Sequence, residues 1–280
     1  MFRNVIITGG GRGIGKAVAA DFARNGDHIL IVSRTLSELE STKAELSKIS
    51  PTINVLVADV SSANDVSKIQ SYIEKSFDGR LDVLVNAAGI YGPIGELADN
   101  DLAEWKKTFD INVFGTVAMC KMTIPFMKKQ GGGRIVNFSG GGDGALPRFT
   151  AYSSSKGAII RFTESLGDEL KSYKIYVNAI APGGVNTKFL DNLLLAGEGK
   201  VGKEIWERSV KQKSDGGVPP EKAAQLIFWL ASPEATGVTG KYLSALHDKY
   251  KEFPGHLNDL QSTDIYNMRR VKPEHRGKSW

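Results

Sequence analysis

The sequence predicts an α/β protein in which a doubly wound parallel β-sheet is covered by helices on both faces. Six short runs rich in Val, Ile and Leu alternate with longer amphipathic segments, and the first run is followed by a glycine-rich loop. Each run is apolar along nearly its whole length, as strands are when helices bury both faces of their sheet.

The apolar runs give the order of the expected strands. They cover residues 4–8, 28–33, 54–60, 81–89, 133–140 and 175–183, with a last strand within 240–246. The amphipathic segments predict helices over residues 14–25, 36–49, 63–77, 102–129 and 151–173. Such a sheet binds its ligands at the carboxyl ends of its strands.

Two segments depart from this alternation. Residues 186–217 are glycine-punctuated with apolar clusters, and we expect them to form a mobile lid after the sixth strand. Residues 246–280 are a polar extension behind the last strand. We therefore expect one domain over residues 1–245, which includes the lid, followed by the C-terminal extension.

The composition excludes several classes of protein. The chain has a net charge of +5 from scattered Lys and Arg, so neither nucleic acid nor a membrane is an expected partner. The single cysteine, Cys120, and four histidines without ligand spacing indicate no disulfide and no metal site. Since no apolar run is long enough to cross a membrane and the chain opens directly on a strand, we expect a cytoplasmic protein.

The loop "TGGGRGIG" at residues 8–15 indicates the ligand. Gly9, Gly13 and Gly15 let the backbone turn tightly and approach a pyrophosphate, whose charge then faces a helix N-terminus. A glycine-rich turn without a ligand is the alternative. Because the loop is the first element of a βαβ run, the sequence favours a Rossmann-type dinucleotide site.

The end of the second strand indicates which dinucleotide binds. An NAD enzyme carries an acid for the ribose 2′-hydroxyl about twenty residues beyond the loop. This chain has Ser33 and Arg34 there, and its first acidic residue is Glu38. A guanidinium binds a 2′-phosphate through two hydrogen bonds, and Arg12 offers a second contact. NADP(H) is therefore favoured over NAD(H), with a solvent-facing Arg34 as the alternative.

A tyrosine and a lysine lie four residues apart in "YSSSK". In a helix, Tyr152 and Lys156 share one face about one turn apart, and Ser139 ends the preceding strand. A phenol has a pKa of about 10, which is too high for efficient proton transfer near neutrality. A nearby ammonium favours the phenolate, so we expect Lys156 to lower the pKa of Tyr152.

Together these residues resemble the short-chain dehydrogenase/reductase family over about residues 1–245. The resemblance rests on the order and spacing of the following motifs: "TGGGRGIG", Asp59 in "ADV", "NAAG" at 86–89, Asn112, Ser139, "YSSSK" at 152–156 and "PGG" at 182–184.

The resemblance implies four catalytic residues. Tyr152 is the general acid in carbonyl reduction and the base in the reverse direction, and Lys156 lowers its pKa and binds the nicotinamide ribose. Ser139 polarises the substrate carbonyl, and Asn112 holds a water that links Lys156 to solvent. The alternatives are a turn residue for Ser139 and an ordinary helical asparagine for Asn112.

The resemblance also implies the cofactor contacts. Asp59 and the Val60 backbone meet the adenine, Asn86 and Gly89 line the cleft, and Thr187 approaches the carboxamide. Asp59 has a second interpretation as the cap of the helix that starts near residue 63. The full expected set is Gly9, Gly11, Arg12, Gly13, Ile14, Gly15, Ser33, Arg34, Asp59, Val60, Asn86, Ala87, Gly89, Tyr152, Lys156, Pro182, Gly183, Val185 and Thr187.

The implied activity is NADP(H)-dependent interconversion of a ketone or aldehyde and an alcohol. The substrate stays open among 3-oxoacyl, polyketide-like, steroid and sugar carbonyls. An NAD(H)-dependent alcohol dehydrogenase and a non-catalytic NADP(H)-sensing regulator are the alternatives. The family implies a homotetramer or homodimer, with helices 102–129 and 151–173 at the interface.

Two regions differ from the family pattern. The loop "GGGDGALPRF" after Ser139 leaves room near the carbonyl, with Leu146, Arg148 and Phe149 as expected wall residues. The extension carries more apolar side chains than a disordered tail needs. We expect residues 250–270 to pack on the lid or a neighbouring subunit, with Arg269 or Arg270 near the substrate entrance.

Overall fold

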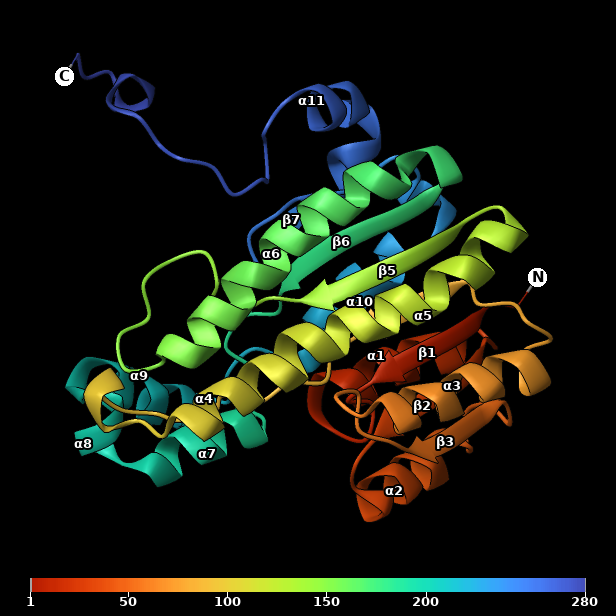
Figure 1. The fold of residues 1–280 in the computed structure, drawn as a ribbon, viewed down its shortest axis with the longest axis horizontal. Helices are drawn as coiled ribbons and strands as arrows, with labels where there is room; N and C mark the ends of the chain where they lie inside the picture. The colour runs from red at the N-terminus through yellow and green to blue at the C-terminus, as the bar shows by residue number, and fades with distance from the viewer. Residues whose placement is uncertain (1, 280) are drawn as a thin grey trace.

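The computed structural model describes residues 2–279 and contains a seven-stranded parallel sheet between two layers of helices (Figure 1). The strand order is β3-β2-β1-β4-β5-β6-β7. The order reverses between β1 and β4, so a crevice opens at the carboxyl ends of these two strands. The predicted fold class is confirmed. The strands are β1 (Asn4–Thr8), β2 (His28–Ser33), β3 (Ile53–Val57), β4 (Val83–Asn86), β5 (Gly133–Phe138), β6 (Ile175–Ala181) and β7 (Tyr242–Ser244).

The five predicted helices are present, with differences at their ends and a break within residues 102–129, whereas the helices beyond residue 187 were not predicted. Several strands are shorter than predicted because the polar or glycine-rich residues at their carboxyl ends leave the sheet as loops. The helices are α1 (Gly13–Arg24), α2 (Leu36–Leu46), α3 (Ala63–Ser76), α4 (Leu102–Phe109), α5 (Gly115–Gln130), α6 (Thr150–Leu170), α7 (Lys188–Ala196), α8 (Glu198–Val201), α9 (Lys203–Ser214), α10 (Pro220–Leu230) and α11 (Leu257–Ser262).

The helix predicted over residues 102–129 is not continuous. A π-helical turn, Asp110–Phe114, separates α4 from α5. Within this turn the side-chain amide of Asn112 bonds both the N–H and the carbonyl of Ile90, each at 2.9 Å. A π turn adds one residue per turn, and the apolar pattern of the sequence does not register such a local change.

The predicted mobile lid is built from three helices, α7, α8 and α9. Gly197 and Gly202 separate them, with φ of +83° and +87°. Apolar side chains from the lid pack on Phe149, and Leu193 and Val201 are almost fully buried there. The lid is therefore a packed helical layer, and its mobility stays a prediction.

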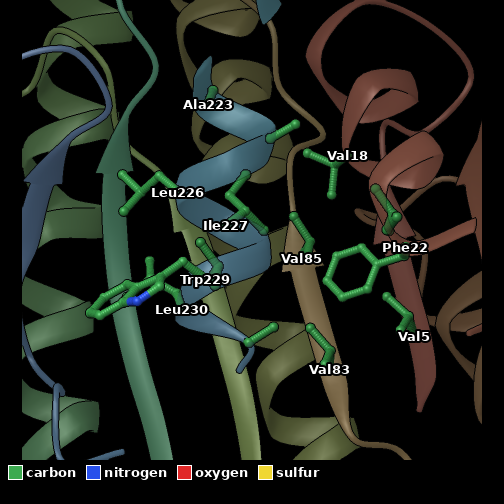
Figure 2. Close-up of a cluster of buried hydrophobic side chains, with 14 of the residues drawn as sticks. Val5, Val18, Phe22, Val83, Val85, Ala223, Leu226, Ile227, Trp229 and Leu230 are labelled. Carbon is green, nitrogen blue, oxygen red and sulfur yellow. The ribbon is translucent and has the colours of Figure 1, made fainter. Parts of the chain in front are cut away.

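Buried side chains fill both faces of the sheet. On one face, α1 and α10 pack through Phe22, Ile227 and Leu226 against Val83 and Val85 (Figure 2). On the other face, α3, α5 and α6 cover a second apolar cluster. Burying one such large aliphatic or aromatic side chain stabilises the fold by about 1.5–3 kcal/mol, so these two layers hold the strand ends in place.

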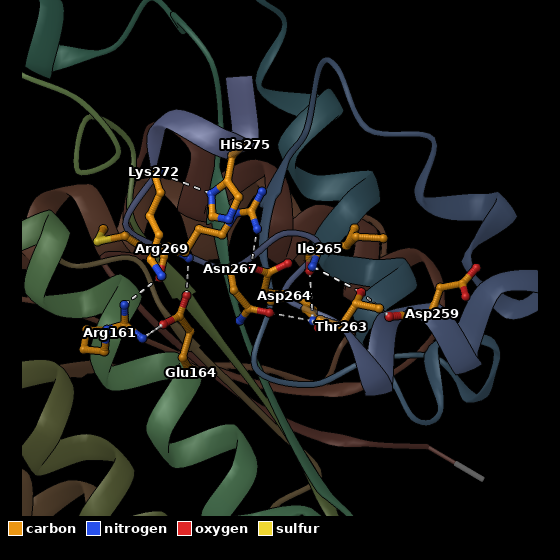
Figure 3. Close-up of polar contacts among 12 residues, drawn as sticks. Arg161, Glu164, Asp259, Thr263, Asp264, Ile265, Asn267, Arg269, Lys272 and His275 are labelled. Carbon is orange, nitrogen blue, oxygen red and sulfur yellow. Dashed lines mark hydrogen bonds and ion pairs between the residues drawn. The ribbon is translucent and has the colours of Figure 1, made fainter. Parts of the chain in front are cut away.

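The C-terminal extension docks on its own chain. The backbone N–H of Tyr242 on β7 donates to the carbonyl of Tyr266, and the main chain of Met268 bonds Arg161 and Glu164 of α6 (Figure 3). Phe253 and Leu260 are buried in the same core cluster as α10. The segment packs on α6, α10 and β7 rather than on the lid, and packing on a neighbouring subunit stays a prediction.

One buried lysine fastens this segment. The Lys241 ammonium donates to the carbonyls of Thr263 and Ile265, at 3.2 and 2.9 Å, and to the Asn267 side chain at 2.7 Å. Lys241 is only 4% exposed. Its charge is compensated by oxygen atoms of the extension, so the end of the sheet and the extension form one unit.

Candidate active site

A cavity of about 1000 Å³ lies at the carboxyl edge of the sheet. The loops after β1, β4, β5 and β6, helix α6, the lid and the extension form its walls. It brings together the following residues of the set expected from the sequence: Gly9, Arg12, Gly13, Ile14, Gly15, Ala87, Gly89, Tyr152, Lys156, Pro182, Gly183, Val185 and Thr187. One continuous site therefore combines the glycine loop with the Tyr152–Lys156 pair.

The glycine loop requires residues without side chains. A Cβ on Gly9, whose φ is +67°, would lie 2.9 Å from the backbone of Ala87. A Cβ on Gly15 would overlap the carbonyl oxygen of Gly9. The loop thus passes against the end of β4 and turns directly into α1.

The N-terminus of α1 suits an anion. Arg12 is its N-cap residue but makes no side-chain capping bond, and the first turn has no acidic side chain. The first N–H groups of the helix have no intrahelical partner, and the helix dipole is positive there. This geometry fits the pyrophosphate of a dinucleotide.

The loop after β6 closes over the glycine loop. The Thr187 hydroxyl caps α7 by accepting from the N–H of Phe189 at 3.3 Å. The methyl group of Thr187 would lie 3.1 Å from a Cβ on Gly13. The predicted loops therefore face one another across the cofactor end of the cavity.

The two predicted phosphate-binding arginines each contact a carboxylate. Arg12 bonds Glu38 at 2.7 Å, and Arg34 lies 3.6 Å from Asp59. Both guanidinium groups are about half exposed. Surface ion pairs of this kind are worth only about 0–1 kcal/mol, so either arginine is able to exchange its partner for a phosphate.

Asp59 is not a helix cap. The cap of α3 is Ser62, which accepts from the N–H of Asp65. Asp59 accepts instead from the N–H and hydroxyl of Ser61. Although partial burial opposes them, hydrogen bonds from Ser61 and the charge of Arg34 hold the pKa of Asp59 below its usual value.

Six of the expected cofactor contacts lie outside the cavity lining: Gly11, Ser33, Arg34, Asp59, Val60 and Asn86. Val60 is buried against Gly115, and the Ser33 hydroxyl bonds the backbone of Thr35 beside Gly11. Asn86 is a clear correction, since its side chain points into the core. Its amide donates to Asn137 at 2.9 Å and approaches the Cys120 sulfur. Asn86 thus links β4 to β5 and does not line the cleft.

Tyr152 and Lys156 lie together on α6 and both line the cavity. Lys156 is 5% exposed, and its ammonium donates to the Phe138 carbonyl at 2.9 Å, 5.7 Å from the centre of the Tyr152 ring. Burial lowers the pKa of Lys156 to about 8. The ammonium therefore carries its charge at neutral pH.

The pKa of Tyr152 is raised, contrary to the expected lowering by Lys156. Burial is the main cause, and the neighbouring phenols of Tyr91 and Tyr242 act in the same direction. The physical reason is that burial desolvates the phenolate, while the Lys156 ammonium is bound to the Phe138 carbonyl. Tyr152 is thus fully protonated at neutral pH.

Ser139 does not reach the cavity. It is fully buried, and its hydroxyl donates to the backbone carbonyl of Lys156 at 2.7 Å. The cavity wall at this point consists of Gly140 and Gly141. The prediction that Ser139 polarises a substrate carbonyl is therefore wrong for this geometry. The serine fixes α6 to the end of β5, and the sequence could not indicate which way its side chain points.

Asn112 does not line the cavity and lies behind Tyr152 and Lys156. Besides clamping Ile90, its amide donates to the Ser155 hydroxyl at 3.0 Å. It is almost fully buried. Its side chain thereby fixes the loop after β4 relative to α6, and its link to solvent through a water stays a prediction.

Several cavity residues were not predicted. Tyr91 packs edge-on against the rings of Tyr152, Phe189 and Phe149, with centroid distances of 4.7, 4.8 and 5.4 Å. The position of Tyr91 directly after the "NAAGI" stretch at the end of β4 was the signal that could have found it.

Polar groups from two other elements complete the wall. Tyr242 comes from β7 and Asp143 from the loop after β5, and both line the cavity. Of the wall residues expected in that loop, Leu146 and Phe149 line the cavity. Arg148 instead ties the lid by donating to the Gly199 carbonyl at 2.5 Å.

The described part of the chain, residues 2–279, has no cluster of three His, Cys, Asp or Glu side chains able to hold a metal. Nor is any helix of these residues long and apolar enough to cross a bilayer.

Arg269, one of the two arginines expected near the substrate entrance, lines the cavity and pairs with Asp264 at 2.7 Å.

Comparisons with known proteins show what the chain is similar to. The profile of the family described as short chain dehydrogenase matches residues 3–196. The short-chain reductase protein NovJ of Streptomyces niveus is 35% identical over 240 residues, 84% of this chain and 89% of that protein. A crystal structure of an actinorhodin polyketide ketoreductase with NADPH has a TM-score of 0.79 and 26% identity, over 87% of this chain and 95% of that one. A crystal structure of an NAD⁺-bound xylitol dehydrogenase has a TM-score of 0.78 and 27% identity, over 86% of this chain and 96% of that one.

Proposed function

The chain belongs to the short-chain dehydrogenase/reductase family of oxidoreductases, and from this premise we propose that it reduces a ketone or aldehyde to an alcohol with NADP(H). The observation that carries the proposal is the shared cavity of the glycine loop and the Tyr152–Lys156 pair. When bound, the reduced nicotinamide supplies the hydride. The chain's own residues bind the cofactor, orient the carbonyl and deliver the proton.

Tyr152 acts as the general acid. Burial keeps the phenol protonated, and its raised pKa means that it gives up the proton only once negative charge develops on the substrate oxygen. An alkoxide is a much stronger base than a phenolate, so the proton moves to it readily. The Lys156 ammonium then stabilises the phenolate that remains.

The choice of NADP(H) rests on Arg12 and Arg34. Both guanidinium groups flank the loop at the end of β2, and their ion pairs with Glu38 and Asp59 are exposed and weak. A 2′-phosphate offers each arginine a stronger, doubly charged partner. NAD(H) is the second candidate, since the carboxylate of Glu38 lies beside Arg12 and is available to a ribose hydroxyl. Arg34→Ala is expected to raise the KM for NADPH more than the KM for NADH.

The substrate end of the cavity is mainly apolar and aromatic. Tyr91, Phe149, Phe189 and Leu193 line it, which favours a polyketide-like, aryl or steroid ketone over a sugar. A 3-oxoacyl substrate also fits an apolar channel. We further propose that the protein acts in the cytoplasm as a homodimer or homotetramer, as expected from the sequence.

The test measures the oxidation of NADPH, through its absorbance, in the presence of each ketone of a panel. The panel includes ethyl acetoacetate, 1-phenyl-1,2-propanedione and a steroid ketone. Tyr152→Phe is expected to lower kcat about 10²–10⁴-fold, the usual contribution of a general acid, while the variant still binds NADPH. A wild-type protein that oxidises NADPH with no ketone class, or an active Tyr152→Phe variant, would refute the proposal.

A further inference from the structure

A carbonyl oxygen that receives a proton from Tyr152 has a second lone pair. A second donor aimed at this oxygen stabilises the charge that develops as the carbonyl is reduced, and removing one such donor typically costs 10²–10³-fold in kcat. The Ser139 hydroxyl cannot serve, because it is buried and donates to the Lys156 carbonyl. The Lys156 ammonium donates one of its three hydrogens to the Phe138 carbonyl, and the family resemblance assigns the others to the nicotinamide ribose.

Two tyrosines remain beside Tyr152 in the cavity, Tyr91 and Tyr242. Tyr242 lies on β7, where burial raises the pKa of its phenol and the charge of Asp143 and hydrogen bonding to it act in the same direction. A phenol has a single proton to donate. Tyr242 is therefore the weaker candidate for a bond to substrate.

Tyr91 has the opposite environment. Among residues 2–279, no charged or hydrogen-bonding side chain perturbs its phenol, and burial alone raises its pKa to about 12. The phenol thus keeps its proton across the working pH range. Its ring is held on three sides by Tyr152, Phe149 and Phe189.

The backbone beside Tyr91 is also fixed. Ile90, the preceding residue, is bonded through both its N–H and its carbonyl by Asn112, and Asn112 in turn bonds Ser155 on α6. The loop that carries Tyr91 is thereby tied to the helix that carries Tyr152. Such preorganisation is what makes a donor effective, since no reorganisation is needed as charge develops.

We propose that Tyr91 is the second hydrogen-bond donor to the substrate oxygen, in the role that the family resemblance assigns to Ser139. This inference rests on the proposed reductase function. As hydride adds to the carbonyl carbon, the π electron pair moves to oxygen, which takes the proton of Tyr152. Tyr91 keeps its own proton and only donates a hydrogen bond. Asn112 is then a positioning residue for Tyr91.

The experiment compares four variants in the full-length protein, with NADPH and 1-phenyl-1,2-propanedione as probes. Tyr91→Phe is expected to lower kcat about 10²-fold, with the Kd for NADPH and the Tm little changed. Tyr72→Phe is the matched control, since Tyr72 lies on α3 against Phe77, away from the cavity. Ser139→Ala and Tyr242→Phe are expected to lose less kcat than Tyr91→Phe.

The outcomes separate the two proposals. If the wild type reduces the diketone but Ser139→Ala or Tyr242→Phe loses more kcat than Tyr91→Phe, the inference is overturned and the reductase function stands. A Tyr91→Phe variant that raises KM at unchanged kcat also overturns it, because that pattern indicates substrate packing only. If the wild type reduces no ketone of the panel, both proposals fail.

Discussion

The buried ammonium of Lys156 gives a stability that depends on pH. Burial lowers its pKa from 10.5 to about 8, a difference that corresponds to ~3 kcal/mol. Between these two pH values the unfolded chain binds a proton that the folded protein has lost. Stability therefore rises as pH increases from about 8 towards 10.5, and the penalty for the buried charge is fully present below pH 8.

The measurement compares urea unfolding of the wild type and Lys156→Met at pH 7 and pH 10. Methionine keeps an unbranched apolar side chain at the site but has no proton to bind. We expect the wild type to gain about 2–3 kcal/mol relative to Lys156→Met between these pH values. Other groups that titrate in this range are common to both proteins and cancel in the difference. A difference that stays constant from pH 7 to pH 10 would refute the reasoning.

The same titration predicts the activity profile. Above about pH 8 the Lys156 ammonium loses its charge, so the phenolate formed on Tyr152 is no longer stabilised. We expect kcat for ketone reduction to fall as pH rises through this value.

Three further perturbations test the fold around the site. Gly15→Ala should weaken NADPH binding in a fluorescence titration, because its Cβ would overlap the Gly9 carbonyl and displace the loop. Arg3→Met should cost about 3 kcal/mol in urea unfolding, because it leaves the fully buried carboxylate of Asp27 without its ion pair. Lys241→Met should expose residues 246–279 to limited proteolysis, because their oxygen atoms lose the ammonium that they bind.

Each of these variants has a control on the same chain. A Cβ on Gly199 would have no atom within 4 Å, so Gly199→Ala should leave NADPH binding unchanged. Arg24→Ala breaks an exposed pair with Asp21 and should cost less than about 1 kcal/mol. Lys249→Met removes an exposed lysine and should leave the proteolysis pattern intact. Equal effects in a variant and its control would contradict the corresponding explanation.

The amino-acid sequence by itself determined the layered architecture and the cofactor end of the site. Apolar runs, helical periodicity and glycine spacing are local properties, and each restricts the backbone wherever it occurs. The alternation of strands and helices along the chain and the position of the glycine loop before α1 therefore follow from the sequence. So does the placement of Tyr152 and Lys156 on one face of α6, because side chains four residues apart in a helix point the same way.

Only the tertiary structure decided which side chains reach the cavity. Ser139 ends β5 as predicted, yet its hydroxyl bonds the Lys156 carbonyl, and Asn86 turns into the core. The extension reaches the site from a distant part of the chain. Side-chain direction at a strand end, and the sign of a pKa shift there, depend on burial and on partners far away in sequence. Those partners are known only once the elements have packed.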